Sequence, residues 1–130
     1  MTPQQIMHEI LGIGTDIVEI KRILKAIDRH GKRFLERIFT PKEQHYCFQH
    51  RRFPDHFAAR WAGKEAVVKA FGGGFQQEIS WLDIEICRDH TGKPHVVLSN
   101  KLNELFHTPL ILITLSHSRE YASAFAIYGN

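Results

Sequence analysis

Two acidic residues far apart in the sequence, Asp16 and Glu65, are candidates for holding a divalent metal ion. Glu65 lies among small residues and is flanked by Lys64 and, four positions later, Lys69. A magnesium ion prefers hard oxygen ligands and takes few of them from the protein, which leaves its other positions to phosphate and water. One glutamate and one distant aspartate suit that demand. Nearby lysines would bind phosphate oxygen atoms as point charges.

The same residues also have purely structural explanations. Glu65 and Lys69 have the spacing of a surface ion pair on a helix, which contributes about 0.3–0.5 kcal/mol. Asp16 stands where a strand is expected to pass into a helix, and aspartate is a common N-cap there. Spacing alone favours these structural roles over metal binding.

Ser116 and His117 lie between two apolar segments, where a hydroxyl and an imidazole can bind a phosphate. The alternative is a polar turn with a solvated histidine. No Gly-x-Ser-x-Gly motif is present, so a Ser/His/Asp triad is not expected. The glycines at 12, 14 and 72–74 do not match a P-loop or a dinucleotide-binding motif, and Gly72 is most simply a helix cap.

Basic residues gather in one segment of a chain whose formal net charge is +3. From residue 21 to residue 37 seven residues are basic, and only Asp28 and Glu36 are acidic. Such a patch attracts an anionic partner through its long-range field. The alternative is an ordinary solvated helix face.

The elements that must position these residues follow from hydrophobic periodicity and capping signals, which predict an α+β fold with helices first and antiparallel strands later. Helices are expected at residues 16–30, 40–50, 55–71 and 99–106. Strands are expected at residues 6–15, 80–87, 95–98, 110–115 and 121–128. Residues 34–39 should form a link and residues 116–120 a hairpin loop. Gly12 and Gly14 indicate a backbone that another segment approaches closely.

Length and composition predict one domain over residues 1–130, large enough to bury a core. No apolar run approaches the roughly 18 residues that a membrane-spanning helix needs. The first residues lack the basic start and apolar stretch of a signal peptide. We therefore expect a cytoplasmic protein.

Six stretches resemble the holo-(acyl-carrier-protein) synthases, which are small 4′-phosphopantetheinyl transferases. They occur in the family's order at residues 12–23, 33–43, 57–72, 83–86, 92–94 and 115–122. The Gly-Ile-Gly-x-Asp block at 12–16 and the Lys-Glu-Ala-x-x-Lys-Ala-Phe-Gly block at 64–72 are specific in combination. A small departure is Gly63, where alanine is commoner in the family.

The resemblance implies that the phosphopantetheine arm of coenzyme A is transferred to a serine of apo acyl carrier protein, releasing 3′,5′-ADP, for fatty acid biosynthesis. It implies Mg²⁺ as a cofactor, held by Asp16 and Glu65. It gives Glu65 and Lys69 catalytic roles. The residues expected to contact coenzyme A are Lys64, Lys69, Gly72, Ser116 and His117.

The resemblance also implies two kinds of protein contact. The basic face, through Arg22, Lys25 and Arg29, would dock the acidic helices of acyl carrier protein. Members of the family usually form homotrimers with sites between subunits. Two alternatives from other classes are a basic nucleic-acid-binding domain, which predicts steeply salt-dependent binding, and a non-catalytic protein that docks an acidic partner without a metal.

Overall fold

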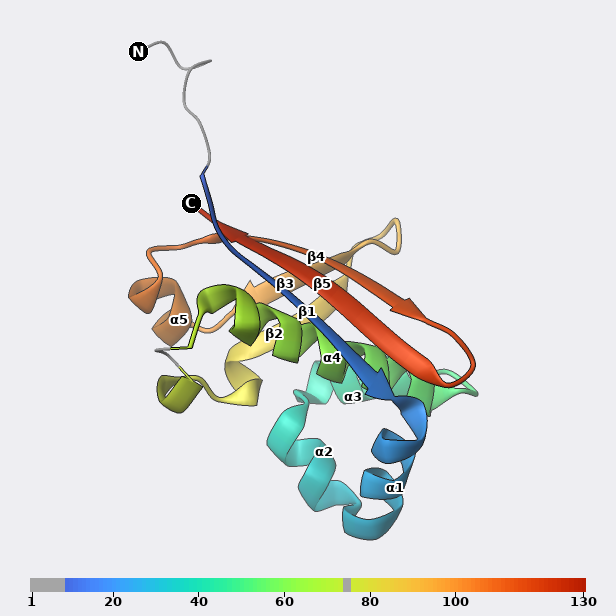
Figure 1. Ribbon diagram of the computed structural model, residues 1–130. Coiled ribbons are helices and arrows are strands. Elements are labelled where there is room, and N and C mark those ends of the chain that lie inside the picture. Colours follow the sequence, from blue (N-terminus) through green and yellow to red (C-terminus); the bar gives the residue numbers. More distant parts are fainter. Residues whose placement is uncertain (1–8, 74–75) are drawn as a thin grey trace, which may run out of the picture.

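The computed structural model describes residues 9–73 and 76–130, and its centre is one long helix against one antiparallel sheet (Figure 1). The sheet has the strand order β1–β5–β4, with bounds Ile10–Glu19 (β1), Leu110–His117 (β4) and Tyr121–Gly129 (β5). Helix α4 (Phe53–Phe71) lies across one face of this sheet. The sheet and α4 together carry the candidate site residues.

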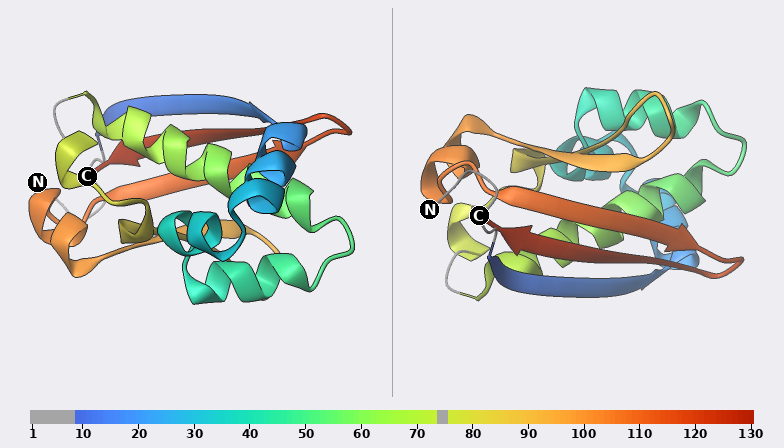
Figure 2. Two further views of the ribbon diagram at one scale, coloured as in Figure 1. Left: turned by 90° about the horizontal axis from the view of Figure 1, so that it is seen from below. Right: turned by 90° about the horizontal axis from the view of Figure 1, so that it is seen from above.

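The remaining elements pack around α4 and along the β4 edge of the sheet (Figure 2). Three helices precede it in the chain: α1 (Ile20–His30), α2 (Lys32–Ile38) and α3 (Pro41–Phe48). After α4 come a short 3-10 helix (Trp81–Asp83), the antiparallel pair β2 (Ile84–Arg88) and β3 (Pro94–Leu98), and α5 (Asn100–Leu105). The predicted α+β fold, with helices packed on an antiparallel sheet, is confirmed.

Helix α4 is buried along most of its circumference because its neighbours cover it on several sides. Its alanines, among them Ala58, Ala62 and Ala66, are fully buried. The glycines of β1 allow the strand to lie against it: a Cβ atom at Gly14 would stand 2.0 Å from the backbone oxygen of Ala66. The predicted close approach of another segment to Gly12 and Gly14 is therefore confirmed.

The predicted start of the first helix at Asp16 is wrong. Strand β1 continues to Glu19, with Asp16 paired opposite Ala124 of β5, and the helix begins at Ile20. Successive strand residues alternate between faces, so Gly14, Asp16 and Val18 all point towards α4. The part of the predicted strand before residue 9 lies outside the described residues.

Other boundaries differ by smaller amounts. Residues 34–39, predicted to be a link, belong largely to helix α2. Helix α4 begins at Phe53, two residues before the predicted start. The first part of the strand predicted at 80–87 is the 3-10 helix Trp81–Asp83, capped by Ser80. Gly74, part of the predicted stop after the helix, is not among the described residues.

The capping signals predicted at Thr40, Gly31, Gly72 and Ser99 are confirmed, whereas the cap predicted at Asp16 is wrong because α1 begins at Ile20 without a side-chain cap. Thr40 accepts a hydrogen bond from the backbone N–H of Glu43, and the Glu43 carboxylate accepts one from the backbone N–H of Thr40. Gly31 ends α1, and Gly72, with φ +94°, ends α4. Ser99 caps α5. These signals are reliable because each depends on a few neighbouring residues.

The face of the sheet opposite α4 is apolar and uncovered by any described helix (Figure 2, right). Its exposed side chains come from all three strands and include Leu11, Ile13, Ile17, Leu112, Tyr121 and Phe125. A contiguous exposed apolar face on a protein marks an interaction surface. Among the described helices, none has the length and apolar character needed to cross a membrane.

Candidate active site

Asp16, Glu65 and Lys69 line one pocket between β1, α1 and α4. Its volume is about 340 Å³. Its floor comes from the strand and from α4, and one wall comes from α1. The lining residues are Asp16, Ile17, Val18, Arg22, Ile23, Ala26, Phe34, Trp61, Glu65 and Lys69. Two carboxylates, a lysine and an arginine therefore face one concave space with apolar walls, as in ligand-binding pockets generally.

The ammonium of Lys69 joins the helix to the strand. Its Nζ donates to Asp16 Oδ1 at 3.0 Å and to the backbone oxygen of Thr15 at 3.0 Å. Asp16 is therefore the ion-pair partner of Lys69 in α4 and is not an N-cap. Of the two side chains, Lys69 is 52% exposed and Asp16 18%, so the ion pair remains open to the pocket.

The carboxylate of Glu65 is held in an environment that favours its protonated form. Partial burial raises its pKa most, the negative charge of Asp16 raises it further, and the positive charge of Lys69 opposes both. Asp16 acts on Glu65 because both carboxylates line the same pocket, although the residues come from distant parts of the chain. A cation between them would relieve the repulsion between the two negative charges.

The expectation that Lys64 contacts phosphate is wrong in this structure. The side chain of Lys64 is fully buried on the other side of α4, and its Nζ lies 2.7 Å from Glu43 Oε1. It also donates to the backbone oxygen atoms of Trp81 and Ile84. An ammonium has three donors, and protein oxygen atoms accept all of them. Burial lowers its pKa, and the charge of Glu43 opposes that shift.

Ser116 and His117 lie at the end of β4, not in the hairpin loop, and they are outside the lining of the pocket. Ser116 is on the exposed face of the sheet, and His117 Nδ1 is 3.8 Å from Asp55 Oδ2. Gly72, at the end of α4, is likewise outside the lining. A single chain does not bring these three residues to the Asp16–Glu65 pocket.

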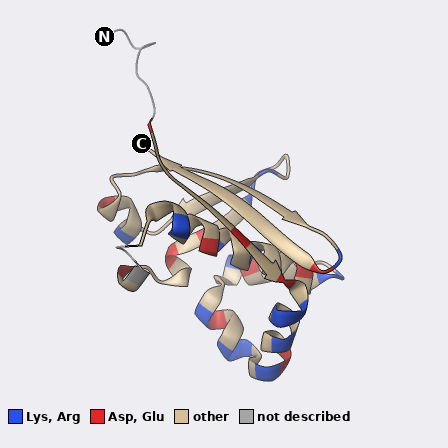
Figure 3. Ribbon diagram, in the orientation of Figure 1, with Lys and Arg blue, Asp and Glu red and all other residues tan. Residues whose placement is uncertain are grey.

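The basic residues predicted to bind a partner lie together on α1. Arg22, Lys25 and Arg29 line a broad groove of about 830 Å³ along this helix. Figure 3 shows basic residues along both α1 and α2. Arg22 lines the groove and also the Asp16–Glu65 pocket. The groove also contains Asp28, and Arg22 links it to the pocket that holds the two carboxylates.

Sequence reasoning missed Arg60, a buried arginine in α4. It is 1% exposed, its guanidinium lies 4.2 Å from the centre of the Tyr46 ring, and its Nε and Nη1 have no hydrogen-bond partner among the described residues. Burial, His50 and then the charge of Arg60 lower the pKa of His56. A charged residue within the apolar run of α4 was the available signal, and the prediction gave it no role.

Known proteins match nearly all of the chain. A model of the 4′-phosphopantetheinyl transferase superfamily matches residues 12–126. The holo-(acyl-carrier-protein) synthase of Protochlamydia amoebophila (strain UWE25) is 52% identical over 120 residues, which cover 92% of this chain and 98% of that protein. The chain belongs to the holo-(acyl-carrier-protein) synthase family.

Solved structures of the family have the same fold. The holo-(acyl-carrier-protein) synthase from Bacillus anthracis str. Ames, in complex with CoA (3′,5′-ADP), matches with a TM-score of 0.79 and 36% identity, covering 93% of this chain and 97% of its own. The enzyme from Neisseria meningitidis matches with a TM-score of 0.85 and 32% identity, covering 92% of this chain and 98% of its own. The resemblance stated from sequence is confirmed, and this family member is a phosphopantetheinyl transferase.

Proposed function

We propose that this chain transfers the 4′-phosphopantetheine group of coenzyme A to a serine of apo acyl carrier protein, with Asp16, Glu65 and Lys69 at the reaction site. The observation that carries the proposal is the meeting of two carboxylates and a lysine in one pocket, in a member of this family. The B. anthracis relative is in complex with CoA (3′,5′-ADP). The product serves fatty acid biosynthesis, which depends on the modified carrier.

Asp16 and Glu65 have the chemistry of a magnesium site. They offer hard oxygen ligands from two segments. Burial and then the charge of Asp16 raise the pKa of Glu65, and a divalent cation would oppose both effects. Two protein carboxylates leave positions for phosphate oxygen atoms and water. Bound Mg²⁺ would supply positive charge to the diphosphate of coenzyme A.

Lys69 and Glu65 have distinct tasks in the transfer. The ammonium of Lys69, already placed beside Asp16, binds a phosphate oxygen atom and stabilises the charge that develops there. The serine oxygen forms a bond to phosphorus while the bond to 3′,5′-ADP breaks. Glu65 is our candidate for taking the serine proton, because its carboxylate lines the same pocket as Lys69 and Asp16.

We propose that the enzyme is a homotrimer with sites between subunits. The uncovered apolar face of the sheet gives such an assembly a surface to bury. Ser116 lies on that face and His117 follows it at the end of β4, so one copy could present this strand end to the pocket of another. This arrangement would let both residues bind phosphates of coenzyme A, which they cannot do from within their own chain's pocket.

The basic groove on α1 is the proposed docking surface for acyl carrier protein. Arg22, Lys25 and Arg29 would contact the acidic helices of the carrier, and Arg22 adjoins the pocket. Lys25 lines the groove but not the pocket, so Lys25→Glu should raise the KM for carrier protein and leave that for coenzyme A unchanged. Lys93→Glu, at the turn between β2 and β3, serves as the control. Equal loss for both substrates would contradict this docking surface.

The proposed reaction is tested by mixing the chain with apo acyl carrier protein, coenzyme A and Mg²⁺ and weighing the carrier by mass spectrometry. The expected result is a gain of one phosphopantetheine group that EDTA abolishes. No gain in mass would overturn the proposal. Steeply salt-dependent binding to nucleic acid in its place would support the alternative function.

A further inference from the structure

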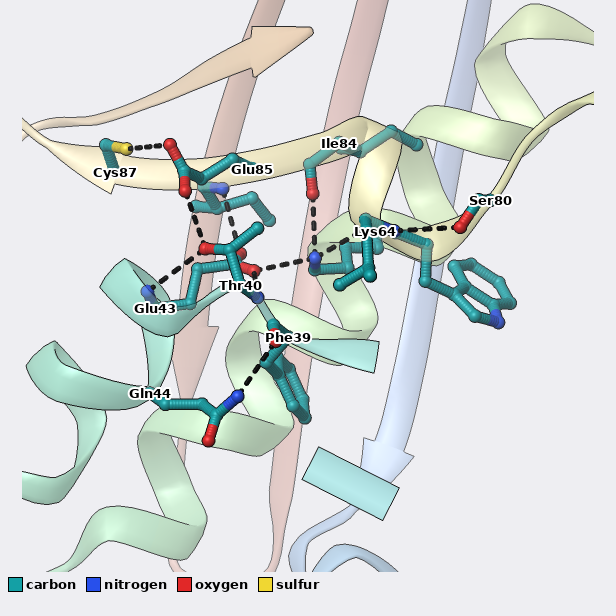
Figure 4. Close-up of polar contacts among 12 residues, drawn as sticks. Phe39, Thr40, Glu43, Gln44, Lys64, Ser80, Ile84, Glu85 and Cys87 are labelled. Atoms are coloured by element: carbon teal, nitrogen blue, oxygen red, sulfur yellow. Dashed lines mark hydrogen bonds and ion pairs between the residues drawn. The ribbon is translucent and has the colours of Figure 1, made fainter. Parts of the chain in front are cut away.

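An enclosed ion pair lies directly behind the candidate site. Glu43 of α3 and Lys64 of α4 are 2.7 Å apart, and neither side chain has any exposed surface. Figure 4 shows the pair between α3, α4 and the start of β2. Lys64 immediately precedes Glu65, so the pair and the pocket belong to the same turn of one helix.

Every polar atom of the pair has a partner from a different segment. Besides the contacts of Lys64 with Trp81 and Ile84, Glu43 Oε2 accepts from the backbone N–H of Ile86 at 2.9 Å, and Oε1 accepts from that of Thr40 at 2.9 Å. The pair therefore fastens α4 to the cap of α3, to the 3-10 helix and to β2. Because each of these side-chain atoms has a hydrogen-bond partner, one geometry of the pair is strongly preferred.

A buried ion pair is a poor way to gain stability. Removing two charges from water costs several kcal/mol per ion, and replacing such pairs with apolar residues is often neutral or stabilising. The pair is therefore better explained by the geometry it imposes than by the stability it adds.

Two routes connect this geometry to the pocket. Successive residues on a helix are about 100° apart, so anchoring Lys64 on one side sets the direction in which Glu65 leaves the other. Lys64 also holds the backbone of Trp81, whose ring lies 5.1 Å from that of Trp61, and Trp61 lines the pocket. A shift of the Glu43–Lys64 pair would therefore move both the Glu65 carboxylate and the Trp61 wall of the pocket.

We propose that the Glu43–Lys64 pair is a positioning device that sets the rotation of α4 so that Glu65 faces Asp16 across the pocket. This inference rests on the proposed function of that pocket. Misplacing a reacting group by about 1 Å can cost 10²-fold in rate. Lys64 thus acts through Glu65 and not by contact with substrate.

The test uses the double variant Glu43→Gln with Lys64→Met, which leaves no unpaired buried charge. The amide introduced by Glu43→Gln can still accept from the backbone N–H of Ile86, and a second variant, Glu43→Leu with Lys64→Met, is available if the first folds poorly. The readouts are Mn²⁺ affinity by electron paramagnetic resonance with coenzyme A present, and kcat and KM separately. We expect Mn²⁺ affinity to fall about tenfold or more and kcat to fall by about 10²-fold, with folding confirmed by circular dichroism.

Two controls separate this inference from its alternatives. Leu102→Ala, in α5, lowers stability without touching the pair, and Mn²⁺ affinity of its folded form should match that of the unchanged chain. Glu65→Gln should weaken Mn²⁺ binding directly; if it does not, the proposed function of the pocket fails. If Glu65→Gln weakens binding while the folded double variant keeps normal affinity and kcat, the pair has only a structural role.

Discussion

The two sides of α4 carry the same chemistry in opposite settings. On one side, Lys69 pairs with Asp16 at the edge of an open pocket, with 52% of the lysine exposed. On the other, Lys64 pairs with Glu43 and is fully enclosed. The open pair keeps oxygen atoms and an ammonium available to a ligand, whereas the enclosed pair directs all of its hydrogen bonds to protein. Burial and the number of protein partners, not residue type, decide which lysine can meet a substrate.

Removing one partner of the enclosed Glu43–Lys64 pair should have the largest effect on the free energy of unfolding. Lys64→Met leaves the Glu43 carboxylate buried and unpaired, and we expect a loss of about 3–5 kcal/mol in the free energy of unfolding. Urea denaturation at pH 7 measures it. A loss below about 1 kcal/mol would mean that water reaches Glu43, and the contrast between the two sides of α4 would disappear.

Disturbing the contact between β1 and α4, on the side of the open pair, should have a smaller but substantial effect on stability. Gly14→Ala places a Cβ atom against the backbone oxygen of Ala66, which cannot rotate away. We expect a loss of about 1–3 kcal/mol, as for other overpacked sites, together with weaker Mn²⁺ binding because β1 carries Asp16. Gly73→Ala is the control, since a Cβ atom there meets nothing within 4 Å. Unchanged stability in Gly14→Ala would contradict the close contact of β1 with α4.

A histidine at the start of α4 gives the helix a pH-dependent contribution to stability. Burial lowers the pKa of His56 to about 4, and electrostatic repulsion from the neighbouring His50 and Arg60 adds to the effect. The unfolded chain takes up the proton near pH 6.5, so stability should fall as the pH drops from about 6.5 to about 4.

The variant that tests this pH dependence is His56→Phe. Its free energy of unfolding should change less between pH 7 and pH 5 than that of the unchanged chain, because position 56 no longer binds a proton in the unfolded state. Denaturation at the two pH values measures the difference. An identical pH dependence in both proteins would show that other groups cause the acid sensitivity.

Removing the exposed lysine should have the smallest effect on folding. Lys69→Met breaks an ion pair that is open to solvent, so we expect a change of at most about 1 kcal/mol in the free energy of unfolding. Transfer activity should nevertheless fall by about 10²-fold or more, since the charge proposed to stabilise the phosphates is lost. Denaturation and carrier mass spectrometry together give both values. A large stability loss with normal activity would reverse the roles assigned to Lys64 and Lys69.

The sequence predicts those features of the structure that depend on residues close together in the chain. The box formed by Thr40 and Glu43, the end of α1 at Gly31 and the family blocks around Asp16 and Glu65 all follow from neighbouring residues. The position of Asp16 within β1 does not, because glycines hide the alternation of the strand, while the isoleucines after it have helical spacing. Pairing with β5, which is distant in sequence, decides the outcome.

The side of the helix on which each lysine falls is beyond the reach of sequence patterns. Lys64 turns inward because Glu43, Trp81 and Ile84 supply oxygen atoms for its ammonium, and those partners come from three separate segments. The proposed contribution of Ser116 and His117 to the pocket of another copy would likewise depend on contacts outside one chain. Such features arise from long-range packing, which spacing along the sequence does not encode.

Asp16 and Glu65 are proposed to hold a divalent metal ion together, and Mn²⁺ binding in the presence of coenzyme A measures this independently of catalysis. Electron paramagnetic resonance should show that Asp16→Asn and Glu65→Gln each weaken Mn²⁺ binding by at least about tenfold. Glu104→Gln, at an exposed position in α5, should leave it unchanged. Normal Mn²⁺ affinity in both carboxylate variants, with the fold intact, would contradict the account.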